Sequence, residues 1–135
     1  MTLQQTARNT YVEGSVQTAS PERLLLMLLD RLVLDVERGL RAQAEKAYPQ
    51  AGKDFVHAQA IVTHLMSTFQ PEGLKGGPEL MSLYMYLNRR LIQANVRRDE
   101  KAGKESLWLA KNINDLWKRV AVAAAAEAKA NEGKK

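Results

Sequence analysis

The sequence predicts an all-α fold, an antiparallel up-down-up-down four-helix bundle, and three observations support this prediction. Apolar residues recur at three- and four-residue steps in four segments of helical length. Loops of about two to nine residues join these segments, and none of the segments shows the alternation of a strand. At 135 residues the chain is long enough to bury a core without disulfides or a structural metal.

We expect the chain to divide into three parts. Residues 1–19 are polar and mixed, which indicates an irregular or weakly helical N-terminal arm, and residues 20–120 form the bundle. Residues 121–130 contain seven alanines, which favour helix but supply little apolar surface. We therefore predict that residues 121–135 are an Ala-rich helical extension that frays and ends in a disordered tail, NEGKK.

The first helix is predicted to begin at Ser20 and Pro21. Serine is a good N-cap, and proline at the first helical position loses nothing by lacking an N–H. The helix should run to about residue 46, before Tyr48-Pro49. Its apolar face consists of Leu25, Leu28, Leu29, Leu32, Val33, Val36 and Leu40.

Met27 and Leu34 lie on the opposite side of this helix, seven residues apart. Two interpretations stay open: another helix covers them, or they form an exposed apolar spot that contacts a partner.

The second helix is predicted over residues 51–69. Its apolar face consists of Phe55, Ala58, Val62, Leu65, Met66 and Phe69. His57 and His64 lie off this face, and no third ligand accompanies them at helical spacing. We therefore expect exposed structural histidines and no metal site. The Pro/Gly-rich residues 70–78 form the loop that follows.

The third helix, residues 80–96, has more apolar surface than one side of an ordinary helix needs. The expected core stripe consists of Leu80, Leu83, Tyr84, Leu87, Leu91 and Ala94. A second stripe consists of Met81, Met85, Ile92 and Val96, and Asn88 and Asn95 lie on the seam between the two. Such a helix is either enclosed by several neighbours or keeps one stripe for a partner.

The fourth helix is predicted to begin near Glu100. Its apolar face consists of Leu109, Ala110, Ile113, Leu116, Trp117, Val120 and Ala124. Trp108 lies off this face, so it either packs against a neighbouring segment or anchors a partner.

The composition argues against an enzyme. The chain has no cysteine, which excludes thiol catalysis and zinc ribbons, and its two histidines lie on an outer face. We find no nucleophile with a base oriented by a third group, so no catalytic residue, metal or cofactor is predicted.

Localisation follows from the apolar runs. The longest run of large apolar side chains, residues 24–29, has six residues, which is too short for a signal peptide or a membrane span. We expect a cytoplasmic protein that does not insert into membranes.

Two binding functions remain as alternatives. The net charge of +5 lies in the second half of the chain, where Arg89, Arg90, Arg97 and Arg98 cluster, and this would suit nucleic acid. Few aromatic residues interleave with these arginines, so we expect no nucleic-acid partner. The off-core apolar residues instead favour a module that binds an apolar peptide, because flexible methionine side chains repack readily around partners.

Several landmarks, taken in order, resemble the FliS family of flagellar secretion chaperones, from Tyr11 to about residue 120. They are Tyr11, TASPE at 18–22, Ala58 and Ile61, Gly76-Gly77, Leu83-Tyr84 with Tyr86, Arg90-Leu91 with Ala94-Asn95, Asp99 and Trp117. One departure lies in the first helix, where the family has Leu-Tyr-Asp-Gly and this chain has Leu28-Leu29-Asp30-Arg31.

The resemblance implies a four-helix bundle that binds the C-terminal segment of flagellin and prevents its premature polymerisation. It also implies a contact with the cytoplasmic domain of an export-gate protein, and we expect at most a weak homodimer. On this reading the flagellin-binding residues are Met81, Met85, Asn88, Ile92, Asn95 and Val96, with Tyr11 in the arm covering the groove when flagellin is absent. Met27, Leu34 and Trp108 form a secondary apolar surface.

Overall fold

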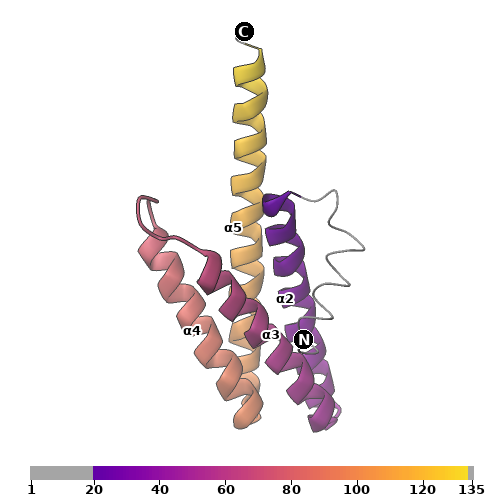
Figure 1. Ribbon diagram of the computed structural model, residues 1–135. Helices are drawn as coiled ribbons and strands as arrows, with labels where there is room; N and C mark the ends of the chain where they lie inside the picture. Colours follow the sequence, from indigo (N-terminus) through magenta and orange to yellow (C-terminus); the bar gives the residue numbers. More distant parts are fainter. Residues whose placement is uncertain (1–19, 134–135) are drawn as a thin grey trace, which may run out of the picture.

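The computed structural model describes residues 20–133. The helices are α2 (Pro21–Ala44), α3 (Tyr48–Thr68), α4 (Gly77–Val96) and α5 (Glu100–Glu132). Successive helices run in opposite directions, and each packs against the next, with α5 returning to α2 (Figure 1). The predicted all-α antiparallel four-helix bundle is therefore confirmed.

Local chemistry explains where the helices begin. The Ser20 hydroxyl accepts the Arg23 N–H at 3.2 Å, and Pro21 occupies the first turn of α2. The Asp99 carboxylate likewise accepts the Ala102 N–H at 3.2 Å at the start of α5. The predicted starts at Ser20 and near Glu100 are confirmed, since side-chain caps satisfy N–H groups that have no partner within the helix.

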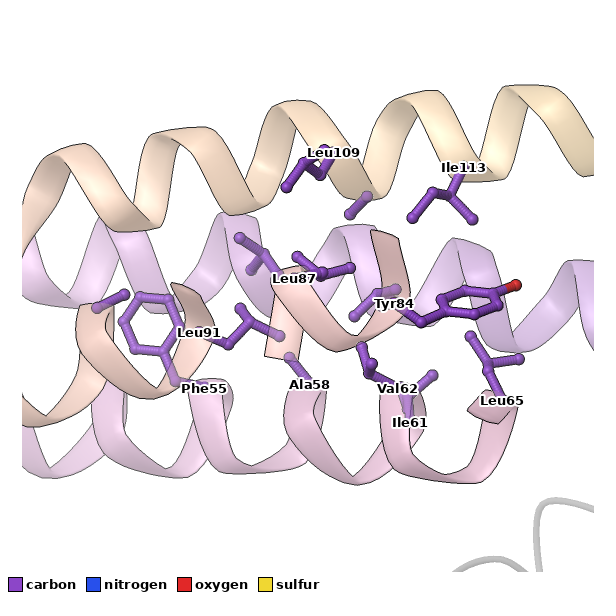
Figure 2. Packing of buried hydrophobic residues seen from close by; sticks show 14 of the residues in the cluster. Phe55, Ala58, Ile61, Val62, Leu65, Tyr84, Leu87, Leu91, Leu109 and Ile113 are labelled. Carbon is purple, nitrogen blue, oxygen red and sulfur yellow. The ribbon is translucent and has the colours of Figure 1, made fainter. Parts of the chain in front are cut away.

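The core is one cluster to which all four helices contribute, and Figure 2 shows side chains of α3, α4 and α5 meeting in it. Tyr84 is among its largest buried side chains, and its hydroxyl accepts the Trp117 indole N–H at 2.8 Å. The Phe69 ring meets both aromatic rings edge-on, with centroid distances of 5.9 Å and 6.1 Å. This aromatic group fixes the end of the core nearest the α3–α4 loop.

Four residues predicted on apolar faces are exposed instead, namely Leu83, Leu116, Val120 and Ala124. Leu83 lies at the edge of the apolar sector of α4. Leu116 is 43% exposed and Val120 is 45% exposed, although both share a side of α5 with the buried Leu109 and Ile113. The prediction was wrong for these residues because helical period identifies a face but not which of its positions the neighbouring helices cover.

The Ala-rich segment continues α5 well beyond the rest of the bundle (Figure 1). The helix includes Asn131 and Glu132, which we had expected in the disordered tail, and Gly133 follows as the C-cap. The division of the chain at residues 19 and 120 stays a prediction.

A buried carboxylate joins α2 to α3. Asp35 is 1% exposed; its Oδ1 accepts a hydrogen bond from Arg31 Nε at 2.9 Å, and its Oδ2 pairs with His57 Nδ1. His57 is exposed, as predicted, but its Nδ1 makes a specific hydrogen bond with Asp35.

Candidate functional site

The second stripe of α4 reaches the surface of the bundle. Met85 is 49% exposed, Ile92 41% and Val96 74%, although the other side of the same helix is completely buried. On α3, Val56 is 50% exposed. We call Val56, Met85, Ile92 and Val96 the apolar row. From Met85 to Val96 it spans about 16 Å, at 1.5 Å per helical residue.

Contacts between α3 and α4 place these residues on one seam. A Cβ added to Gly52 on α3 would lie 3.5 Å from Asn95 Oδ1 on α4, so these two positions face each other. One turn further along each antiparallel helix, Val56 comes opposite Ile92. The exposed apolar side chains of the two helices therefore adjoin.

The other residues of α4 that were predicted to bind flagellin share the side of the helix that carries the row. Met81, Asn88 and Asn95 are all partly buried. Among the described residues, Asn88 Oδ1 is buried without a hydrogen-bond partner. The structure thus brings together Met81, Met85, Asn88, Ile92, Asn95 and Val96.

The opposite edge of α4 is polar and bonded to α5. Tyr86 Oη donates a hydrogen bond to Glu105, which also accepts Arg90 Nε at 3.0 Å. That bond to Glu105 raises the pKa of Tyr86, because a tyrosinate beside a carboxylate is unfavourable. The Arg89 guanidinium lies 5.9 Å from the Tyr86 ring centroid. Of the four arginines considered for nucleic-acid binding, Arg89 and Arg90 therefore make contacts within the bundle, and Arg98 also does so by lying over the Tyr48 ring.

A small apolar pocket of about 140 Å³ opens near the α3–α4 loop. Its lining consists of Leu25, Leu65, Thr68, Phe69, Gln70, Tyr84 and Trp117. Burial raises the pKa of Tyr84, although the hydrogen bond from Trp117 acts in the opposite direction. The pocket is large enough for one apolar side chain but not for a cofactor.

The residues predicted to form a secondary surface differ in exposure. Met27 and Leu34 are partly buried, whereas Trp108 is 64% exposed among the residues that the structure describes. Tyr11 lies outside the described residues. Sequence reasoning missed Val56, although its place off the apolar face of its helix was a usable signal.

Within residues 20–133, no three His, Asp or Glu side chains lie close enough to hold a metal ion. No helix in this part of the chain is both long and apolar enough to cross a membrane.

Comparison with known proteins identifies the family. Residues 3–124 match the family model described as "Flagellar protein FliS". The flagellar secretion chaperone FliS of Escherichia coli K12 is 32% identical over 109 residues, covering 79% of this chain and 80% of the relative. The proteins of the same name from Salmonella typhimurium LT2 and Bacillus subtilis 168 are 32% and 27% identical, each covering 81% of this chain, and 82% and 81% of the relatives. The chain therefore belongs to the FliS family of flagellar proteins.

Proposed function

We propose that this protein is a cytoplasmic export chaperone that binds the C-terminal segment of flagellin and prevents it from polymerising before export. Three curated relatives are named flagellar secretion chaperones, which supports the general role. The observation that carries the proposed site is the apolar row, in which Met85, Ile92 and Val96 are exposed on a helix whose other side is completely buried.

The row suits a segment that is disordered when free. Ordering such a segment costs conformational entropy, and burial of apolar surface along an elongated seam offsets this cost. Methionine side chains at the seam can adjust to the shape of the bound segment. Asn88 and Asn95 supply polar groups for peptide N–H and C=O groups that lose their contact with water.

This function needs no cofactor or catalytic residue. Binding covers apolar flagellin surface that would otherwise contact other flagellin molecules, so the free energy of binding alone prevents assembly. A contact with the cytoplasmic domain of an export-gate protein and a weak homodimer also stay predictions, for which we assign no surface.

Isothermal titration calorimetry tests the proposal. The full-length protein is titrated with the C-terminal segment of the flagellin from the same organism, and we expect saturable binding at micromolar concentrations or below. The N-terminal segment of the same flagellin is the control and should bind more weakly. Absence of saturable heat with the C-terminal segment would refute the proposed function.

A further inference from the structure

The positive charge of the described chain is concentrated at one end of the bundle. We call residues 41–53 and 97–104 the basic end, since they hold seven basic residues and three acidic ones. The basic residues are Arg41, Lys46, Lys53, Arg97, Arg98, Lys101 and Lys104. The net charge of the basic end, acidic residues included, is +4, and the net charge of the whole chain is +5. The remaining residues between 20 and 133 have a net charge of −1. Division of the sequence into halves hides this pattern, because the two segments lie far apart along the chain.

Direct contacts make the two segments one surface. The Arg98 guanidinium lies 3.6 Å from the centroid of the Tyr48 ring, which joins the α4–α5 loop to the start of α3. Gln43 Nε2 donates a hydrogen bond to the Ala94 carbonyl at 2.9 Å, joining the end of α2 to the end of α4. Figure 1 shows the α2–α3 and α4–α5 connections at the same end of the bundle.

Local carboxylates leave most of this charge uncompensated. Glu100 pairs with Lys104 at 2.9 Å, and Asp99 caps α5, so Glu45 is the remaining acidic residue of the basic end. All seven basic side chains are exposed. Of these seven, only Lys104 has a carboxylate partner within residues 20–133. The other six are Arg41, Lys46, Lys53, Arg97, Arg98 and Lys101.

Helix stability does not explain the whole set. Basic residues that follow a helix C-terminus interact favourably with its dipole, which accounts for Lys46 after α2 and Arg98 after α4. Both, however, have left-handed backbone, with φ of 59° and 51°, a conformation that glycine adopts more easily. Lys101 lies in the first turn of α5, where a positive charge is unfavourable. The concentration of charge therefore points to an external anionic partner.

The basic end adjoins the apolar row directly. Val96 is the last residue of the row, and Arg97 is the first basic residue of the α4–α5 connection. We propose that the basic end binds an acidic stretch of the same client polypeptide whose apolar residues lie on the row. This inference rests on the proposed function and adds the charge pattern by which the client is recognised.

Other anions fit the basic end less well. Base stacking on single-stranded nucleic acid needs open aromatic faces, but Arg98 lies over Tyr48, the one aromatic residue of the basic end. Insertion into a membrane surface needs apolar side chains among the basic ones, and no large apolar side chain of residues 41–53 or 97–104 is exposed.

The test uses three peptides based on the flagellin C-terminal segment. The first peptide carries four added glutamates at its N-terminus, and the second carries four added glutamates at its C-terminus. The third peptide carries four added glutamines at each end. Fluorescence anisotropy should show about 10-fold tighter binding of one glutamate peptide than of the glutamine peptide at low salt. This preference should disappear at about 0.5 M salt, because counterions screen exposed charges.

Matched variants locate the effect. The double variant Arg97→Glu, Lys101→Glu should lose the preference for glutamate, and Arg97→Gln, Lys101→Gln should lose part of it. The control Lys75→Glu, Lys129→Glu makes the same change in net charge at exposed positions elsewhere, and it should keep the preference. Circular dichroism checks that each variant is folded.

The outcomes separate the two proposals. If none of the peptides binds, the proposed function fails. If all three bind with equal affinity, the apolar row stands and the inference about the basic end is overturned. The protein is also mixed with a 12-nucleotide single strand or with phosphatidylserine vesicles. If the three peptides bind equally and the Arg97→Glu, Lys101→Glu variant loses binding to one of these probes, the inference about the basic end is overturned in favour of nucleic acid or a membrane surface.

Discussion

Replacement of Ile92 by aspartate tests the apolar row most directly. Ile92 is 41% exposed. Complete burial of an isoleucine side chain is worth about 2 to 3 kcal/mol, so covering the exposed part contributes about 1 kcal/mol to binding. Burying an unpaired carboxylate under the bound segment costs about 2 kcal/mol or more in addition. The dissociation constant should therefore rise at least about 100-fold.

The same change should leave the free protein folded. The buried part of Ile92 contributes about 1 to 2 kcal/mol to the free energy of unfolding, which is less than the total stability of a typical domain. Calorimetric titration with the flagellin C-terminal segment measures the affinity, and circular dichroism at 222 nm measures the helix content.

Two variants serve as controls for Ile92→Asp. The preceding residue, Leu91, is 0% exposed, so Leu91→Asp should unfold the protein. Val122 is exposed on the α5 extension, so Val122→Asp should change neither affinity nor folding. The reasoning is refuted if Ile92→Asp binds the segment normally, or if it loses helix content as Leu91→Asp does.

Three further predictions concern stability. Gly39→Ala should lower the free energy of unfolding by about 1 to 3 kcal/mol, because the new Cβ would lie 2.9 Å from the buried Phe55 ring. Gly52→Ala is the matched control: its new Cβ meets only ordinary contacts, so this variant should be neutral or more stable than wild type. Urea denaturation measures the free energy of unfolding of both variants. Asp35→Ala should lower the free energy of unfolding by about 2 kcal/mol in the same assay, because the hydrogen bonds to Arg31 and His57 are lost. A decrease below about 0.5 kcal/mol would contradict the conclusion that Asp35 joins α2 to α3. Burial raises the pKa of Asp30, but hydrogen bonds from Asn114 and Lys118 outweigh this effect, so the pKa is lowered overall. The ionised Asp30 carboxylate therefore stabilises the fold at pH values above the unfolded-state pKa near 3.8. This stabilisation is lost as the pH falls through the lower folded-state pKa. Asp30→Asn should therefore reduce stability at pH 7 by less than about 1 kcal/mol, and the difference from wild type should disappear below about pH 3 in thermal unfolding curves.

Features set by local chemistry could be predicted from the sequence. The start of α2 depends on Ser20 and Pro21, and the start of α5 depends on Asp99, so in each case the residues that decide the boundary are adjacent. Helical period also identified Leu29, Leu87 and Ile113 as core residues, because each lies near the centre of its apolar face. The off-core position of Met85, Ile92 and Val96 followed from the same reasoning.

Features that depend on a second helix could not be predicted in this way. Leu116 and Val120 are exposed although they lie on the predicted apolar face, because helical period contains no information about which positions of a face the other helices cover. Asp35 is buried because His57 and Arg31 both reach it, and His57 lies on another helix. The basic end likewise appears only when two loops distant in sequence meet through Tyr48 and Arg98.

The long α5 implies a gradient of local stability along one helix. Its 33 residues extend about 50 Å, whereas the 20 residues of α4 extend about 30 Å. Around Ile113 the helix is held by the core, but its last turns rely on their own hydrogen bonds, and an isolated helix of that length is marginal in water. Amide hydrogens should therefore exchange slowly near Ile113 and rapidly beyond Ala123. Any molecule that contacts these last turns would shift their helix–coil equilibrium toward helix, so amide protection there would report its arrival.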